Sequence, residues 1–446
     1  MSVVLDRTRI TSGYSSLPAW SSAARAARAV LQDFNAAAVW AGLTTFIWYA
    51  VGMVPVQVSV IGKFALGPDQ ASSWIFIIWF SGAISSIALS LAYRQPIPIT
   101  STIPGLIFMG ALAGQHSVPE LLGANLLAGV LMVLLGVTGV GGWMLALLPM
   151  PIAMGMLAGS ILPDLTRAVA ATTSGALVAG ATVSGYLLGR VLRNQRVPPP
   201  AVALICGGVA VFATYQGGTA PISWSLPSVV LPPMELSLSS FIAVSLPMVV
   251  LSMGLGNVQG LGFLRGQGYR VPVNTVTCVL GINSIVNAFF GGHAAIVSRN
   301  GLPIMASPDA GPHAARYWAN IVAAVLTLSI ALAAGPVVSL LGILPYSYVV
   351  TLAGLAILPS FQNAMEQTLS SKLSLGAIIA FIVAATPFSF LGITSAFWAI
   401  IAGLTASFVA ERPDLLEYWR GDRAAVEDRR EPPVPTAIPS MQVRSA

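Results

Sequence analysis

The stretch PIPITSTIPG (residues 96–105) decides the fold, because it interrupts an apolar segment that would otherwise form a membrane-spanning helix. Pro96, Pro98 and Pro104 exclude a continuous helix, and the β-branched residues between them favour an extended strand. Proline is well tolerated in the first turn of a helix, so a helix is expected to begin at Pro104–Gly105. The span near 97–115 is therefore predicted to be a strand followed by a half-length helix.

A second stretch, FFGGHAAIVSRNGLP (289–303), repeats the pattern: a glycine pair, a β-branched run, then Gly301 and Pro303. Irregular backbone at membrane depth must line a cavity within the protein. Interrupted segments at corresponding positions of two chain halves indicate the binding site of a secondary transporter. The helix N-termini that follow favour an anionic ligand. The structural alternative is a pair of ordinary Pro/Gly kinks.

The composition independently indicates a polytopic membrane protein. Of 446 residues, 56% are hydrophobic and only 8% are charged, whereas soluble proteins carry about 25% charged residues. The net charge of +6 has no accompanying basic patch with interleaved aromatics, which argues against nucleic-acid binding. No P-loop, GxSxG or HExxH motif is present, and three scattered histidines do not form a metal site. We therefore expect neither an enzyme nor an ATP-driven pump, and no cofactor or metal.

Fourteen spans fit the apolar segments, since each span needs about 20 apolar residues. With a cytoplasmic N-terminus, eight basic residues fall in inside loops and only Lys63 and Arg167 fall outside, as the positive-inside rule requires. An even total places both termini in the cytoplasm. The inside residues are Arg94, Arg190, Arg193, Arg196, Arg265, Arg270, Arg316 and Lys372.

Internal symmetry is visible in the fifth and twelfth spans, LLPMPIAMGMLAGSIL (147–162) and LPYSYVVTLAGLAIL (344–358). Because seven is odd, two such repeats are inverted in the membrane. The predicted fold is an all-α polytopic membrane protein with fourteen transmembrane segments in two seven-span inverted repeats and short β-strands in spans 3 and 10. The predicted divisions are a cytoplasmic segment (1–34), the first repeat (35–215), an extracytoplasmic linker (216–237), the second repeat (238–410) and a disordered cytoplasmic tail (411–446).

Several motifs resemble the benzoate:proton symporter family of bacterial membranes: PIPITSTIPG, SLPMVVLSMGLGNVQGL (245–261), FGGHA (290–294) and SPDAGPHAARYW (307–318). The similarity extends from about residue 35 to 410. The family is related to uracil-transporter-like and sulfate-transporter-like carriers. The resemblance implies a core domain of spans 1–4 and 8–11 that moves against a gate domain of spans 5–7 and 12–14. It also implies a location in the bacterial inner membrane and a homodimer formed through the gate.

By the same resemblance, the substrate site lies where the two interrupted spans meet. This chain has Gly256-Asn257 where family members usually have Gln-Asn, and Ser298, Arg299 and Asn300 where they usually have small, apolar residues. Arg299 is either a bidentate clamp for a substrate carboxylate or a residue near the cytoplasmic surface. The predicted substrate-binding residues are Thr100, Ser101, Thr102, Asn257, Gln259, Gly292, His293, Ala294 and Arg299.

These features predict a secondary transporter that imports a small, benzoate-like carboxylate with a proton by alternating access. His293 is one candidate for the coupling group. Glu120 and Glu366 are others if they lie deeper than their span-end positions suggest, and the substrate itself is a third possible proton carrier. The alternatives are a carrier of the same fold for a nucleobase or inorganic anion, and a non-transporting membrane scaffold or intramembrane enzyme. Paired broken spans disfavour the scaffold, which has no need of them.

Overall fold

The computed structural model describes residues 30–139, 149–192, 198–214, 224–386, 388–390 and 393–427. Within them, seven helices are long and apolar enough to cross a membrane, and five shorter apolar helices accompany them. The two interrupted segments, each a strand with a short helix, complete the predicted fourteen. The protein is therefore a multi-pass membrane protein.

The first half of the chain contains one interrupted segment among continuous helices. The strand β1 precedes the half-length helix α4, which begins at Ile103, one residue before the predicted Pro104. The elements of this half are α2 (Ala36–Lys63), α3 (Pro68–Tyr93), β1 (Ile99–Ser101), α4 (Ile103–Ala111), α5 (Val118–Thr138), α7 (Met150–Ser174), α8 (Ala176–Leu192) and α9 (Pro199–Thr214).

The second half opens on a composite helix, Leu238–Gly266, in which α10 (Leu238–Ser240), α11 (Leu246–Val250) and α12 (Gly262–Gly266) alternate with the π-helices η1 (Phe241–Ser245) and η2 (Leu251–Leu261). Two 3₁₀ turns, η3 (Pro308–Ala310) and η4 (His313–Ala315), follow the interrupted segment. The remaining elements are α13 (Val273–Phe289), β2 (Ala295–Val297), α14 (Leu302–Met305), α15 (Tyr317–Leu332), α16 (Ala334–Ile343), α17 (Tyr346–Leu369), α18 (Ser374–Ala385), β3 (Ser389–Phe390), β4 (Ile393–Thr394), α19 (Ser395–Ala410) and α20 (Arg412–Glu427).

The repeat noticed between the fifth and twelfth spans corresponds to α7 and α17. Each helix follows a proline, Pro149 or Pro345, and each carries an internal proline, Pro163 or Pro359. In both helices the internal proline is the fourteenth residue, so the prolines of the two helices occupy equivalent positions. The two helices pack against each other. Solved structures with the inverted-repeat fold, described below, match this arrangement.

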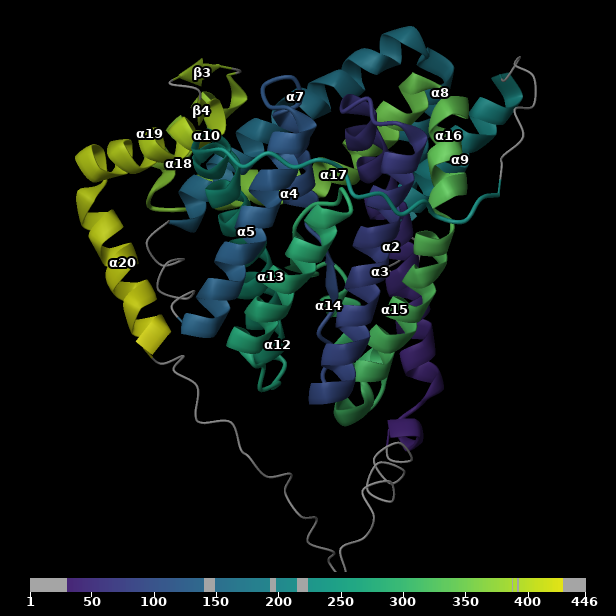
Figure 1. Ribbon diagram of the computed structural model, residues 1–446, viewed down its shortest axis with the longest axis horizontal. Coiled ribbons are helices and arrows are strands. Elements are labelled where there is room, and N and C mark those ends of the chain that lie inside the picture. Colours follow the sequence, from purple (N-terminus) through teal and green to yellow (C-terminus); the bar gives the residue numbers. More distant parts are fainter. Residues whose placement is uncertain are drawn as a thin grey trace, which may run out of the picture.

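The helices pack in two groups (Figure 1). In one group α15 packs on α2 and α3, and α13 packs on α5 and α3. In the other, α7 packs on α17 and α18, with α8 and α9 paired at one edge and α18 and α19 at the opposite edge. These groups coincide with the core and gate spans expected from the resemblance, and the names "core" and "gate" are used for them below. Helices α2 and α4 of the core contact α17 and α7 of the gate.

Two boundaries differ from expectation. We expect the apolar stretch 336–358 to form one span, but the structure divides it at Pro345 into α16 and α17, because proline removes a backbone donor and ends the first helix. The prediction of a disordered tail from residue 411 is wrong for Arg412–Glu427, which forms α20. Leu415 on this helix is only 1% exposed, and the preceding Glu411 carboxylate accepts hydrogen bonds from the Leu375 and Gly376 amides. These contacts order charged residues that sequence composition alone assigns to solvent.

Candidate functional site

The two interrupted segments meet in a short antiparallel sheet. β1 pairs with β2 in the register Ile99↔Val297, Thr100↔Ile296 and Ser101↔Ala295. The Thr102 amide extends the ladder by donating to the Ala294 carbonyl at 2.9 Å. Two strands from opposite halves of the chain thus satisfy each other's backbone groups inside the protein, as irregular backbone at membrane depth requires.

Helix α4 begins where this sheet ends. Thr102 is the N-cap, and its hydroxyl accepts from the Gly105 amide at 3.1 Å. The composite helix covers this end of α4: a Cβ added at Gly105 would collide with Met248 of α11. Because the first amides of a helix carry partial positive charge, this buried N-terminus favours an anion beside it.

His293 lies beside the α4 N-terminus and is completely buried. Its Nδ1 accepts a hydrogen bond from the Trp74 indole at 3.0 Å, which requires the neutral ring to carry its proton on Nε2. That Nε2 has no hydrogen-bond partner among the described residues, although the backbone of Thr102 lies close to the ring. The Trp74 ring lies 5.9 Å from the imidazole and stacks on Phe64 at 5.7 Å. The site therefore presents a fixed donor next to an aromatic wall.

A buried polar network holds the FGGHA turn in place. Asn287 donates to the His293 carbonyl at 2.9 Å and accepts from Ser81 at 2.6 Å. Ser73 donates to the Phe290 carbonyl at 2.9 Å. Gly292 has no room for a side chain, because a Cβ there would lie 2.8 Å from Ile78. Gly292 and the completely buried Ala294 therefore act through their backbone and shape.

The predicted residues of β1 face different surroundings. The Ser101 hydroxyl accepts from the Gln57 amide at 3.2 Å, and Gln57 in turn accepts from the Trp79 indole at 2.9 Å. Thr100 lies beside a small cavity of about 10 Å³ that Tyr49 and Asn320 also line. Sequence inspection missed Gln57 and Trp74; the one available signal for Gln57 was a lone amide within the apolar run VPVQVSV.

The composite helix Leu238–Gly266 borders the site on another side. Its segment η2 is π-helical over Leu251–Leu261, a geometry often found at functional sites. Asn257 lies on this segment, but its side chain is outside the described part of the structure. Gln259 is described, and its Oε1 accepts from Arg299.

Arg299 lies at the other end of β2 from His293. Since the strand Ala295–Val297 lies between them, the two α-carbons are separated by about 15–20 Å. Besides Gln259, its Nη1 donates to Asn363 of α17 at 3.1 Å, so Arg299 joins the core to the gate. The Arg299 guanidinium is thus engaged with Gln259 and Asn363, which gives this residue a bridging position.

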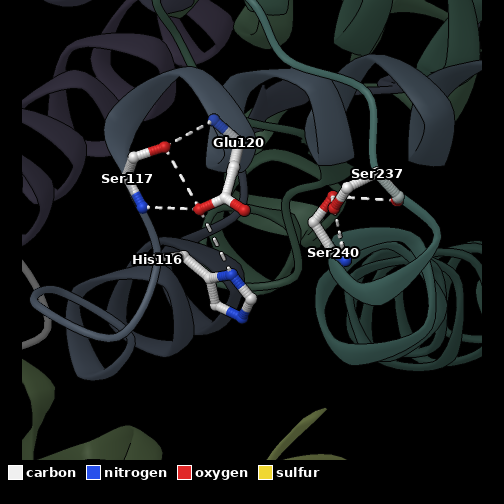
Figure 2. A network of polar contacts seen from close by, with 5 residues as sticks. All are labelled: His116, Ser117, Glu120, Ser237 and Ser240. Carbon is white, nitrogen blue, oxygen red and sulfur yellow. Dashed lines mark hydrogen bonds and ion pairs between the residues drawn. The ribbon is translucent and has the colours of Figure 1, made fainter. Parts of the chain in front are cut away.

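The two acids considered for proton coupling form no hydrogen bond with β1 or β2 in the described part of the structure. Glu120 forms a capping box at the start of α5: its carboxylate accepts from the Ser117 amide at 2.8 Å and lies 3.6 Å from His116 Nδ1 (Figure 2). Glu366 is exposed on α17. Among the described residues, no carboxylate forms an ion pair or hydrogen bond with His293, Thr102 or Arg299.

Inverted seven-span repeats whose broken segments meet in a buried strand pair define a membrane carrier. The helix N-terminus and the His293 donor at that pair suit a small anion. The sequence profile of the benzoate membrane transport protein family matches residues 32–409. The chain belongs to this family, and it is a membrane transport protein rather than an enzyme.

Individual relatives agree with the assignment. The chain is 28% identical to the inner membrane protein YdcO of Escherichia coli, over 75% of this chain and 85% of that protein. It is 25% identical to the benzoate membrane transport protein of Acinetobacter baylyi, over 86% of this chain and 97% of that protein.

Solved structures confirm the fold. The transmembrane domain of the cyanobacterial bicarbonate transporter BicA matches with a TM-score of 0.58 at 14% identity, covering 82% of this chain and 97% of that domain. SLC26A9 matches with a TM-score of 0.57 at 14% identity, covering 92% of this chain and 72% of that protein.

Proposed function

We propose that this protein is a secondary transporter of the bacterial inner membrane that imports a small aromatic carboxylate together with a proton. One observation carries the proposal: the strand pair ends on the α4 N-terminus beside the unpartnered Nε2 of His293, with no described carboxylate in contact. A carboxylate is the chemical group that such a set of donors lacks. The family assignment and the Acinetobacter relative support benzoate as the first compound to test.

The aromatic part of the substrate is supported by the surroundings of His293. Trp74 and Phe64 provide stacked apolar faces, and Met248 adds a polarisable side chain beside the α4 N-terminus. A benzoate-sized ring placed here contacts aromatic carbon, while its carboxylate accepts from His293 Nε2 beside the positive end of the α4 dipole.

Proton coupling follows from the same group. We favour His293 over Glu120 and Glu366, because Glu120 is engaged in its helix cap and Glu366 is exposed. Binding of a carboxylate at Nε2 stabilises the imidazolium form. Because the Trp74 indole only donates, protonation of His293 Nδ1 requires this indole to release its hydrogen bond, and substrate and proton then enter as a neutral pair. A neutral loaded core crosses the membrane interior at lower cost than a core carrying one unpaired charge. The core and the gate are then the two bodies whose relative motion gives alternating access.

Uptake into proteoliposomes tests this proposal. Labelled benzoate is expected to accumulate against its gradient when the lumen is alkaline, and collapse of the pH gradient should abolish accumulation. His293→Gln is expected to abolish gradient-driven accumulation, whereas His313→Gln, which alters an exposed loop histidine, serves as the matched control and should retain it. If a purine base, sulfate or bicarbonate competes with uptake and no aromatic acid does, the substrate class is wrong.

Orientation and assembly complete the proposal. The positive-inside distribution places both termini in the cytoplasm. The gate helices α8 and α9 carry exposed apolar side chains, among them Leu188, Ile205 and Phe212, on a surface suited to lipid or to a second copy of the chain. We propose a homodimer through this surface. Cysteine cross-linking between α9 helices in native membranes tests the dimer.

A further inference from the structure

A cavity lies between the core and the gate, on the α4 side of the strand pair. It encloses about 320 Å³, and it is called the Lys63 cavity here. Helices α2 and α4 form one wall, and α7 and α17 form the other. Ile107 of α4 is one lining residue, and it lies five residues beyond Thr102, or about 7.5 Å along the helix. The cavity is therefore next to, but separate from, the site at His293.

Charge is not balanced within the Lys63 cavity. Lys63 of the core forms an ion pair of 2.6 Å with Asp164 of the gate, and Arg167 contacts the same carboxylate oxygen at 3.3 Å. Two cations share one acid, and no other described carboxylate forms an ion pair with either of them. The side chains of Lys63 and Asp164 are only 16% and 15% exposed, whereas that of Arg167 is 48% exposed, so the excess positive charge lies on the accessible guanidinium. One further anion would complete the group.

The remaining surface of the cavity is apolar. Val56, Val60 and Ile107 line it from the core, and Val349, Val350 and Ile357 line it from the gate. Pockets for small molecules combine such apolar walls with a few placed polar groups, and volumes near 300 Å³ are at the small end of their range. The combination fits a ring or short apolar body that carries one carboxylate.

We propose that the Lys63 cavity is a second binding site, in which a small apolar carboxylate binds Arg167 and Lys63 before it reaches the site at His293. The proposal rests on the proposed function for the identity of the substrate. A carboxylate bound to Lys63 competes with Asp164 for the same ammonium group, so occupancy weakens an ion pair that links core and gate. Binding at the cavity therefore favours the relative motion that transport requires.

Protection from alkylation tests the second site. Val350→Cys places a thiol on the cavity wall, and Thr173→Cys places one on the same end of α7 as a control outside the lining. Both are made with Cys206 and Cys278 replaced by alanine, in purified protein, with a small maleimide as the reagent. Benzoate is expected to slow alkylation at Val350→Cys at least threefold without affecting Thr173→Cys, and neutral benzamide should not protect. Adding Arg167→Gln should raise the half-protecting benzoate concentration about tenfold or more, because one charge-assisted hydrogen bond is lost.

The same variants separate this proposal from the proposed function. Protection at Val350→Cys that persists when His293→Ala is added supports an independent second site. Protection that disappears with His293→Ala, or that benzamide reproduces, overturns it, since the effect would then be conformational or merely steric. If Val350→Cys transports benzoate but shows no protection, the second site is refuted while the transport proposal stands. If no variant transports benzoate but protection at Val350→Cys is retained, the transport proposal is refuted and the binding site in the Lys63 cavity stands.

Discussion

The contact between Arg299 and Asn363 connects the two bodies that alternating access must move, so its removal has a measurable consequence. Asn363 Oδ1 accepts from Arg299 Nη1 at 3.1 Å and from Gln367 at 2.7 Å. A hydrogen bond to a charged group contributes about 1.5–3 kcal/mol. If the bond exists in only one arrangement of core and gate, Asn363→Ala shifts the equilibrium between arrangements by about 10- to 150-fold.

Asn363→Asp is the opposing variant. It keeps the size of the side chain and both acceptor contacts, but it replaces a neutral acceptor with a carboxylate. At 3.1 Å, and with an effective dielectric constant of about 20, the added attraction to Arg299 is about 5 kcal/mol before the desolvation cost of the new charge. We therefore expect Asn363→Asp to hold core and gate in this arrangement and to slow uptake, whereas Asn363→Ala depopulates the arrangement.

Two measurements distinguish these outcomes. Pulsed spin-label distances between Asp309→Cys on the core and Ser370→Cys on the gate, with the native cysteines removed, should broaden toward longer values in Asn363→Ala and narrow in Asn363→Asp. Initial rates of benzoate exchange in proteoliposomes report the functional effect. Gln362→Ala, an exposed neighbour on α17, is the control. The reasoning is refuted if both Asn363 variants leave the distances unchanged and alter exchange by no more than Gln362→Ala does.

Three further outcomes are expected. Glu120→Gln should lower stability by about 1 kcal/mol through the weakened helix cap while leaving the pH dependence of uptake unchanged, and a shifted dependence would return Glu120 to the coupling mechanism. Gly129→Leu should abolish folded protein in size-exclusion chromatography, because a Cβ there would lie 2.9 Å from the Ile285 amide of α13, whereas Gly180→Leu, with open space around it, should be tolerated. Asn287→Ala should cost about 1–3 kcal/mol in thermal unfolding and should weaken benzoate binding, since it releases the His293 carbonyl; unchanged affinity would show that the network does not position the site.

The sequence predicted the two broken spans better than the contacts of their side chains. Prolines and glycines at 96–105 and 289–303 exclude continuous helices locally, whatever surrounds them, and the structure confirms a strand at both positions. It also confirms the match between α7 and α17 as a repeat, because their prolines recur at the same helical positions. These features depend on local backbone chemistry, which a single sequence records directly.

Side-chain partners could not be predicted in the same way. The sequence left Arg299 as either a substrate clamp or a surface residue, but the structure pairs it with Gln259 and with Asn363 on the gate. It did not suggest Trp74, whose indole determines which nitrogen of His293 is free. Such partners lie tens to hundreds of positions apart, and apolar composition alone does not specify which helices face each other.

The sequence by itself determined that this chain belongs in a membrane, that it has two repeats of seven spans each, and that each repeat contains one broken span. Scarce charge, apolar length and proline position are sufficient for those conclusions, since each acts through solvation or local backbone geometry. Only the tertiary structure decided that β1 and β2 pair, that His293 presents Nε2 at the α4 N-terminus, and that Lys63 and Arg299 both reach the gate. Those facts arise from packing between distant segments, because a hydrogen bond or ion pair exists only once two helices have been brought together.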